Sequence, residues 1–470
     1  MILDALPRLS KLRVVHRTTV SFLAALAAAL VGAGHAQADG WLPHPADATW
    51  EYSWTDSVYN TTPTKEKVTV VAPPAGTPST AFQLAWTTQD EGNPSAAPVS
   101  TGTVSFQESN VGLLNTDWNS NQPPPAFPIL CPTAAQCGNS LASAYYNVIW
   151  GVREPTLFEP LLKGTSWTTT GGAQNDVASV NTYVGTEQVT VPAFPQPVLA
   201  AKVQSQITQA GALGDPYGSG VRTVWWVYGV GPVKVEFDHA GGAGAPVTIA
   251  ELVSTNQTPQ TLPSDANYFP LKLNAKGTYS WTNSKYMKKP SVQSYSISQV
   301  ANGSAQFTFT SDLGPLKVSG AYGFTTRLDG VTNLFHTTKA QSLVKMPPLG
   351  PRSAPADQRR HFFTPFDLMV FGFNPLIPAY PAVGNTWTGG TNGRDFSDYG
   401  VTGTAVIVGV QTVKVPAGTF HALAVRTVMK QAGFPFGSGT RTCWFAPGRG
   451  LVKLVFHHGD GSVSTVELIR

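Results

Sequence analysis

Two arginine–tryptophan pairs are the residues of this sequence best suited to holding a ligand. Arg222 and Trp225 stand in one stretch of alternating apolar residues, and Arg441 and Trp444 stand at the same places in a second stretch. A guanidinium binds an anionic group, and an indole face stacks on a flat apolar ligand. Successive side chains of a β-strand point to opposite faces, so each arginine is expected on the face opposite its tryptophan.

Both pairs also have a structural interpretation. Side chains in a sheet pair across strands, and Glu251 and Glu467 stand in nearby stretches where they could pair with the arginines. Lys234 and Lys453 are interpreted as marking a solvated face or a strand edge. Most of the 12 tryptophans recur at equivalent places, where a large ring fills a core. We therefore expect structural roles to dominate and keep the two pairs as ligand-binding candidates.

Other residue types that could do chemistry lack the required spacing. His457 and His458 are adjacent, so in a strand they point to opposite faces and cannot easily share a metal ion. Ser438 lies between glycines without the Gly-x-Ser-x-Gly pattern of a nucleophile. The acids that a two-carboxylate hydrolase could use stand in expected loops: Asp90, Glu91, Asp395 and Asp398. No sequence motif for a metal, phosphate or dinucleotide is present, so neither a metal nor a cofactor is predicted.

Three cysteines bear on the redox compartment. Cys131 and Cys137 bracket a short loop, and in an exported protein they could form a disulfide. A two-cysteine metal site is less favoured, because no further cysteine or nearby histidine completes four ligands. Cys443 lies in an alternating stretch and is expected to be a buried thiol rather than a nucleophile.

The chain contains one set of motifs twice. The stretch from Arg222 to Phe237 matches Arg441 to Phe456 without a gap. Further matches occur in the same order in both halves: Tyr52-Ser-Trp-Thr55 with Tyr279-Ser-Trp-Thr282, Lys163-Gly-Thr-Ser-Trp167 with Val383-Gly-Asn-Thr-Trp387, and Val189-Thr-Val-Pro-Ala193 with Val413-Lys-Val-Pro-Ala417. Repeated order with small drifts in spacing predicts a tandem duplication.

Within each copy the apolar pattern has a period of two. The second copy alternates from Thr404 to Val415, from Phe420 to Met429 and from Thr440 to Phe445, with short turns between the stretches. Leu451 to Phe456 and Val463 to Ile469 follow, joined by Asp460-Gly461, a type I′ hairpin signal. Such short turns join antiparallel neighbours and predict a meander. Helices are expected to be few, with starts near Asn139 and Thr364-Pro365.

A strand–turn–strand signature in the second copy resembles a known family. Val415-Pro-Ala-Gly-Thr-Phe-His-Ala-Leu-Ala-Val425, followed by Thr440-Arg-Thr-Cys-Trp-Phe-Ala-Pro-Gly-Arg-Gly-Leu-Val-Lys453, is similar to the TapB-like group of bacterial secreted domains of unknown function. The resemblance implies an exported antiparallel domain with a strongly curved sheet or half-barrel, and it supplies no catalytic residues. The first copy departs at both turns, so a ligand contact made by these turns is expected in one copy only.

The first forty residues have the pattern of an export signal. A basic segment is followed by an apolar, alanine-rich run from Val20 to Val31 and by Ala36-Gln-Ala38, which fits a cleavage site. Its removal would lower the net charge of the 470-residue chain from +4 to about +1, since Arg8, Lys11, Arg13, Arg17 and Asp4 would leave. The remaining charge gives no argument for a nucleic-acid partner. No later run is apolar and long enough to span a bilayer as a helix.

These observations predict an all-β, mainly antiparallel chain built from two tandem curved-sheet or half-barrel domains with few short helices. The expected segments are a signal peptide at 1–38, a first repeat at 39–255, a linker at 256–266 and a second repeat at 267–470. The favoured function is an exported, periplasmic or extracellular, non-enzymatic protein that binds a small hydrophobic ligand or a cell-envelope partner. The alternatives are a secreted glycan-active hydrolase with two scattered carboxylates and a structural or adhesive surface module.

Overall fold

A computed structural model describes residues 40–58, 60–90, 100–120, 155–171, 177–209, 219–240, 244–287, 289–312, 317–338, 365–370, 373–391, 401–431 and 435–470. The predicted signal peptide, the cysteine pair Cys131 and Cys137 and the helix expected from Asn139 lie outside these residues. Within them, no helix is long and apolar enough to cross a membrane.

The first sheet has twelve described strands, and every neighbouring pair is antiparallel. Its strands are β1 (Thr49–Asp56), β2 (Asn60–Val71), β3 (Ala81–Asp90), β4 (Ser100–Ser109), β5 (Gly112–Ser120), β6 (Leu157–Phe158), β7 (Ser166–Gly171), β8 (Val177–Val189), β9 (Val198–Gln209), β10 (Gly220–Val227), β11 (Gly231–His239) and β12 (Val247–Thr255). Their order across the sheet is β6-β5-β4-β3-β2-β1-β12-β11-β10-β9-β8-β7.

The second sheet has eleven described strands, with one α-helix and one 3-10 helix among the described elements between them. Its elements are β13 (Lys276–Asn283), β14 (Ser291–Ala301), β15 (Ser304–Asp312), β16 (Lys317–Arg327), β17 (Gly330–Thr338), α4 (Pro365–Val370), β18 (Thr386–Thr391), β19 (Val401–Val415), β20 (Gly418–Gln431), the 3-10 helix η3 (Pro435–Gly437), β21 (Gly439–Ala446), β22 (Gly450–His458) and β23 (Val463–Leu468). Their order across the sheet is β17-β16-β15-β14-β13-β23-β22-β21-β20-β19-β18.

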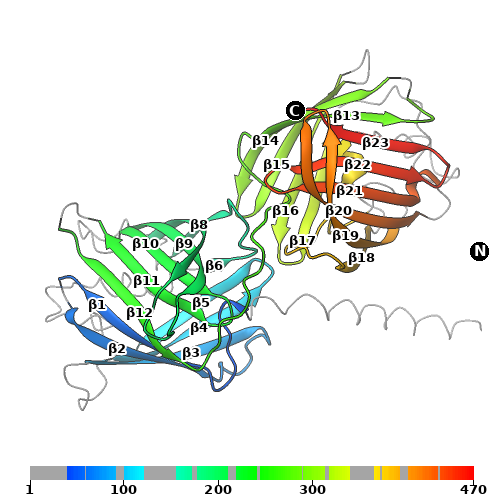
Figure 1. The fold of residues 1–470 in the computed structure, drawn as a ribbon. Coiled ribbons are helices and arrows are strands. Elements are labelled where there is room, and N and C mark those ends of the chain that lie inside the picture. The colour runs from blue at the N-terminus through cyan, green and yellow to red at the C-terminus, as the bar shows by residue number, and fades with distance from the viewer. Residues whose placement is uncertain are drawn as a thin grey trace, which may run out of the picture.

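Each sheet brings its first and last strands together as neighbours. Trp54 of β1 lies opposite Ala250 of β12, and Trp281 of β13 lies opposite Val466 of β23. From this pair the strands run outward as two meanders, and each sheet curves around its own core (Figure 1). The predicted all-β fold with two curved-sheet domains is confirmed.

The same contacts recur at equivalent places in both sheets. The Tyr52 hydroxyl donates to the carbonyl of Pro232 at 2.8 Å, and the Tyr279 hydroxyl donates to the carbonyl of Leu451 at 2.7 Å. The indoles of Trp167 and Trp387 each donate to a proline carbonyl twelve residues earlier in the chain. These repeated contacts agree with the motif match, while the duplication itself stays a prediction.

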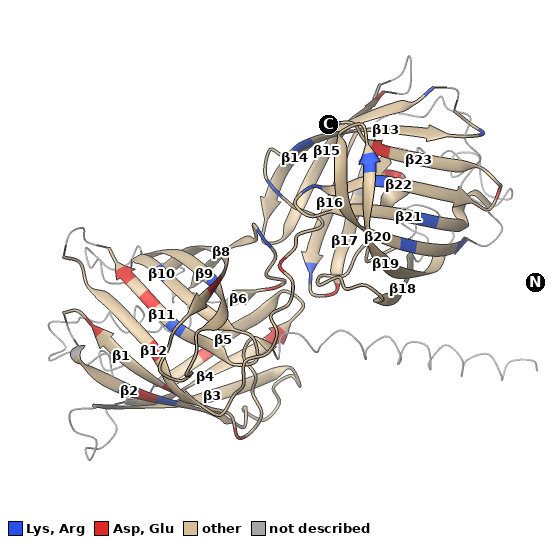
Figure 2. Cartoon of the chain, in the orientation of Figure 1, with Lys and Arg blue, Asp and Glu red and all other residues tan. Residues whose placement is uncertain are grey.

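Alternation along the strands separates a buried inner face from a polar outer face. β1 and β23 alternate strictly between partly exposed and buried residues. The inner face carries large rings, and Trp50, Trp54, Trp167 and Trp281 are all at most 2 % exposed. Charged residues are sparse along the strands (Figure 2). Burial of these rings is the main stabilising term, because apolar area removed from water contributes about 25 cal/mol per Å².

The inner face of the second sheet is filled partly by α4. All six residues of this helix are buried, and the Phe366 ring packs edge-on against Tyr279 and Tyr295 at centroid distances of 5.5 and 5.1 Å. The sequence placed a helix start at Thr364-Pro365, and the structure has the helix from Pro365 to Val370. Proline suits the first helical position because its missing N–H would have no partner there.

One predicted turn is of another type. Asp460-Gly461 was expected to form a type I′ hairpin, which requires positive φ at both central residues. In the structure Gly461 has φ 81°, whereas Asp460 is not among the residues with positive φ. The Asp460 carboxylate instead accepts the Ser462 N–H at 2.8 Å, and the His458 N–H donates to the Ser462 carbonyl at 2.9 Å. The loop therefore has three residues between the bonded strand ends.

The predicted linker runs along the first domain without forming a strand. β12 ends at Thr255 and β13 begins at Lys276. Within this segment Asn256 accepts the Thr49 N–H at 2.9 Å, and Asp265 accepts the Tyr183 hydroxyl at 3.0 Å and the Lys163 N–H at 2.8 Å. These bonds attach the segment to the first domain along its length.

A buried carboxyl on the inner face of the first sheet distinguishes the two domains. Glu66 is 1 % exposed, its Oε2 accepts the Trp54 indole N–H at 2.7 Å, and its Oε1 has no partner among the described residues. Burial raises the pKa of Glu66 to about 8, against the smaller opposing effect of the Trp54 bond. Glu66 lies opposite Tyr52, and Gln293 lies at the matching place opposite Tyr279. The second domain thus has the neutral isostere at this position.

We expect Glu66→Gln to stabilise the protein at alkaline pH. A raised folded-state pKa favours folding below pH 4.5, and this contribution is lost as the pH rises towards 8. The variant should therefore raise the Tm by about 5–10 °C at pH 9 and change it little at pH 5. Thermal unfolding followed by circular dichroism measures both. The reciprocal change Gln293→Glu should lower the Tm at pH 9, and equal Tm values for Glu66→Gln and wild type at pH 9 would contradict the assignment.

Candidate functional site

The two candidate arginines lie on the inner faces of the sheets. Arg222 and Arg441 are each 2 % exposed. Arg441 Nη1 donates to the carbonyls of Leu368, at 3.0 Å, and Met369 in the last turn of α4. Carbonyls at a helix end lack partners within the helix, so Arg441 caps α4. Glu251 and Glu467, the acids expected to pair with these arginines, pair instead with the lysines that lie opposite them on β11 and β22. Both β11 and β22 are interior strands of their sheets.

Those acid–lysine pairs lie on the outer face. Lys234 Nζ is 3.2 Å from Glu251 Oε1, and Lys453 Nζ is 2.8 Å from Glu467 Oε1. Each pair joins residues directly opposite each other on neighbouring strands. Of the two interpretations of these lysines, the solvated face is confirmed and the strand edge is wrong, because they are partly exposed residues of interior strands. Such surface pairs each contribute about 0–1 kcal/mol.

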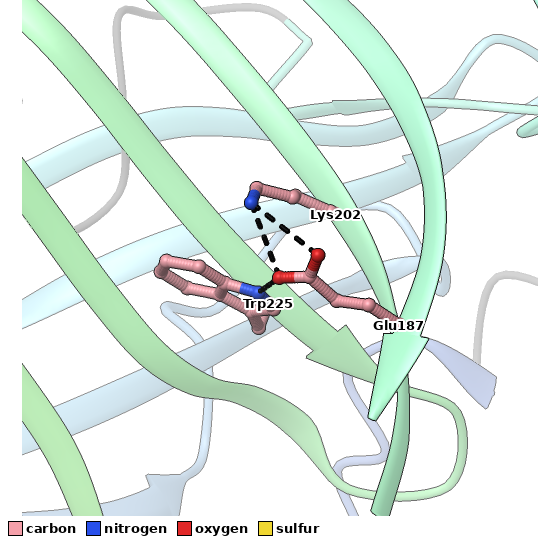
Figure 3. A network of polar contacts seen from close by, with 3 residues as sticks. All are labelled: Glu187, Lys202 and Trp225. Carbon is pink, nitrogen blue, oxygen red and sulfur yellow. Dashed lines mark hydrogen bonds and ion pairs between the residues drawn. The ribbon is translucent and has the colours of Figure 1, made fainter. Parts of the chain in front are cut away.

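The candidate tryptophans lie on the outer face, opposite the arginines as alternation predicts. The Trp225 indole N–H donates to Glu187 Oε1, which also accepts from Lys202 Nζ at 3.1 Å (Figure 3). The ammonium groups of Lys202 and Lys234 stand over the Trp225 ring at 5.1 and 5.6 Å from its centroid. The bond from Trp225 and the nearby Lys202 lower the pKa of Glu187. Trp225, only 8 % exposed, is thus covered by charged neighbours.

The second domain keeps this outer-face contact in neutral form. The Trp444 indole donates to Gln411 Oε1 at 2.8 Å, at the place where the first domain has Glu187. Trp444 is half-buried, and its strand neighbour Cys443 points inward and is 4 % exposed. Burial raises the pKa of the Cys443 thiol to about 11, so the predicted buried, unreactive thiol is confirmed.

The histidine pair divides between the two faces, as predicted. His457 is exposed, and His458 is 5 % exposed between the rings of Phe436 and Phe456, at centroid distances of 3.8 and 4.0 Å. His458 Nδ1–H donates to the Phe436 carbonyl at 2.7 Å, which leaves Nε2 to accept from the Ser464 hydroxyl at 2.8 Å. Ser464 has no exposed surface, so this serine–histidine contact is structural rather than nucleophilic.

The carboxyls that the structure brings together are not those expected from sequence. The side chains of Asp90, Glu91, Asp395 and Asp398 lie outside the described residues. Glu159 has no exposed surface, and burial together with the charge of Glu108 raises its pKa well above the usual value. A substrate cannot reach Glu159, so this pair does not form a hydrolase cleft. The sequence gives no signal for the Glu108–Glu159 pair, since the two residues are 51 positions apart.

A small pocket lined by aromatic rings lies at one end of the second sheet. We call it the aromatic pocket, and its main lining residues are Phe269, Tyr279, Tyr295, Phe307, Phe366 and Arg449. Its volume is ≈ 20 Å³. The rings stack face to face in the Tyr279–Tyr295 pair at 5.9 Å and the Tyr295–Phe307 pair at 5.4 Å, and the Phe366 ring packs edge-on against both tyrosines. Burial raises the pKa values of Tyr279 and Tyr295, and the nearby Arg449 acts in the opposite direction.

The first domain fills the corresponding place with a tryptophan. Trp50 stands two residues before Tyr52, and its indole donates to the Val230 carbonyl at 2.7 Å. In the second domain Gly277 stands two residues before Tyr279, and Arg449 takes the place of Val230 in the gap-free motif match. A Cβ on Gly277 would meet the Tyr295 ring at 2.4 Å. The Tyr295 ring therefore fills the space over Gly277, and the pocket lies beside this ring beneath the Arg449 turn.

Arg449 gives this pocket a charge at its mouth. It is exposed, in the turn between β21 and β22, where its N–H donates to the Ala446 carbonyl at 3.1 Å. Among the described carboxylates, none forms an ion pair with it. Apolar walls, phenolic hydroxyls and one cation suit an amphipathic anion. A ligand contact at these turns was expected in one copy only, and no motif singled out Arg449 or Gly277.

The described residues present no group of three or more metal-ligating side chains. Exposed valines lie on the outer faces of the longest hairpins: Val180 and Val184 in the first domain, and Val408, Val410 and Val428 in the second. A structural or adhesive surface module would use such residues for its contacts.

We expect the buried His458 to make the protein less stable at acid pH. Burial lowers the pKa of His458 from 6.5 to about 4, so between these values the unfolded state binds a proton that the folded state does not. The free energy of unfolding should fall by about 3 kcal/mol between pH 6.5 and pH 4 from this group. Denaturant unfolding across that range measures the loss. His458→Gln should flatten the slope and His457→Gln should not, and an unchanged slope in His458→Gln would refute the assignment.

No family model matches the chain, and no curated protein matches it, so the resemblance to the TapB-like group stays a prediction. One solved structure is described as that of an exported protein with a YmcC-like fold from Bacteroides fragilis. It aligns over 46% of this chain and 99% of its own, with 12% identity and a TM-score of 0.27.

Two further solved structures are similar at the same low level. A chain described as a lipoprotein from Parabacteroides distasonis aligns over 46% of this chain and 98% of its own, with 14% identity and a TM-score of 0.24. A chain in the structure of the Pseudomonas aeruginosa MucA/MucB complex aligns over 62% of this chain and 86% of its own, with 11% identity and a TM-score of 0.17. At these scores the similarities assign neither a family nor a function to this chain.

Proposed function

We propose that this chain is an exported, non-enzymatic binding protein that arose by tandem duplication of one curved-sheet domain. Its second domain binds an amphipathic anion, a molecule with a short apolar part and one acidic group, in the aromatic pocket. The export pattern at 1–38 and the motifs repeated along both halves support the location and the duplication. The ligand is either a free small molecule or part of a cell-envelope molecule with the same chemistry.

One observation carries the ligand proposal. Arg449 lines a pocket of aromatic rings that includes Tyr295, whose ring lies over Gly277, where the first domain has Trp50 at the matching place. A cation at the mouth of an apolar pocket selects a ligand that has both an acidic group and an apolar part. The first domain has Trp50 and Val230 at these places, and its proposed role is to support the second domain structurally.

The same residues favour binding over catalysis. The aromatic pocket has hydroxyls and a guanidinium, but its lining includes no serine, cysteine, histidine or carboxylate. Nucleophilic and acid–base catalysis use such groups in contact with the substrate. Elsewhere, the buried Ser464–His458 contact and the buried Glu159 are out of reach of a substrate.

The proposal is tested with two probes of equal chain length, octanoate and 1-octanol. Isothermal titration of the purified chain should show octanoate binding, and Arg449→Ala should weaken it about tenfold because a charge-assisted hydrogen bond is lost. Binding of the neutral octanol should change little in the same variant. Arg426→Ala, at an exposed arginine of β20 remote from the pocket, is the matched control and should bind as wild type does.

A second variant fills the pocket without removing the charge. Gly277→Trp combined with Tyr295→Val copies the pair that the first domain has, Trp50 opposite Val68. Circular dichroism and the Tm report whether this variant folds. Folded protein should no longer bind either probe. Octanoate binding that survives both this change and Arg449→Ala would refute the aromatic pocket as the ligand site.

A further inference from the structure

The aromatic pocket is too small, as it stands, for a whole alkyl chain. A volume of ≈ 20 Å³ has room for about one water molecule. A second pocket lies between the two domains and has a volume of ≈ 50 Å³. We call it the junction pocket. Its walls include Phe158, Pro160 and Leu162 of the first domain and Leu271, Val300 and Thr326 of the second.

Phe269 lines both pockets. It is 6 % exposed and stands in the segment between the linker and β13. Its ring packs against Phe324, Phe307 and Phe445 at centroid distances of 5.0, 5.9 and 6.5 Å. The aromatic pocket and the junction pocket are therefore neighbours with one residue in common, whose ring belongs to the core of the second domain.

Asn267 connects Phe269 to the turn that carries Arg449 and to the first domain. Its side-chain oxygen accepts the Phe269 N–H at 3.1 Å, and its carbonyl accepts the Gly448 N–H at 2.8 Å. Its side-chain amide donates to the Lys163 carbonyl of the first domain at 3.2 Å. The cation, the shared wall and the domain junction are thus held together by one residue.

We infer that the two pockets are the two parts of a single site for a linear acyl carboxylate, with the Phe269 ring as the partition between them. This inference rests on the proposed function. The carboxylate lies at Arg449, and the chain runs past Phe269 into the junction pocket when the ring turns aside. Pro160, Leu162 and Leu271 give that second part apolar walls suited to methylene groups. The length of the alkyl chain therefore defines the ligand class, because the junction pocket lets the site accept a longer chain.

A series of octanoate, decanoate and dodecanoate tests this inference by isothermal titration. Phe269→Ala removes the partition, so affinity should rise by ~4-fold for each added methylene that becomes buried. In the wild type the increase should be smaller, because turning the ring aside opposes it. Val300→Trp fills the junction pocket from the second domain and should abolish the preference for decanoate and dodecanoate over octanoate.

The outcomes separate this inference from the proposed function. If octanoate does not bind the wild type, or binds independently of Arg449, the proposed function fails and the two-part site fails with it. If octanoate binding depends on Arg449 but neither Phe269→Ala nor Val300→Trp alters the effect of chain length, the two-part site alone is refuted. Should Phe269→Ala fail to fold, Val300→Trp decides, since loss of the longer-chain preference supports the site and its persistence overturns it.

Discussion

Pairing between the first and last strands of each domain is the constraint on which the rest of the structure depends. Once β1 lies beside β12, and β13 beside β23, each sheet must curve around one inner face. That face cannot stay open to water, because its alternating side chains are large and apolar. The two domains meet this requirement differently: the first places Trp50 against the turn at Val230, and the second uses α4 and leaves a small space below Arg449.

The inner faces also contain polar groups, and the domains differ in how these are neutralised. In the first domain Thr248 donates to Asp56 at 2.7 Å and lies 2.8 Å from His239 Nε2. In the second, Asn283 stands in place of Asp56 and donates to Ser464 at 2.9 Å. Together with Gln293 in place of Glu66, this exchange leaves the second domain with neutral amides where the first has carboxyls. Amides are cheaper to bury than carboxylates, because burying an unpaired charge costs far more.

Much of the fold could be predicted from sequence, because it is governed by local patterns. Period-two alternation and short turns predicted β19 to β23 as a meander, and Thr364-Pro365 predicted the start of α4. Arg222 and Arg441 were placed opposite their tryptophans by the same rule. Glu66 could have been found as well, since alternation puts it on the face of Val68. The turn at Asp460 was mistaken because the two-residue signal does not report the length of the loop.

The candidate site could not be predicted, because it depends on a gap between residues far apart in the chain. Gly277 and Arg449 are 172 positions apart, and neither has a motif of its own. The pocket combines the Tyr295 ring over Gly277 with Arg449, and this difference from Trp50 and Val230 is visible only by comparison of the two domains. The junction between Glu159 and Tyr380 is equally long-range: the Tyr380 hydroxyl accepts the Leu161 N–H at 3.0 Å, and only the assembled fold brings these segments together.

The adjacency of the first and last strands also determines when each domain can be completed. Trp54 finds its partner Ala250 only after the whole of the first repeat is available, so no shorter piece of the chain has a finished sheet. Sequence separations of this size make folding slow, since a long loop must close before its contacts stabilise it. For the export proposed above, such a delay would be an advantage, because premature closure of the sheet would block the passage of an unfolded chain across a membrane.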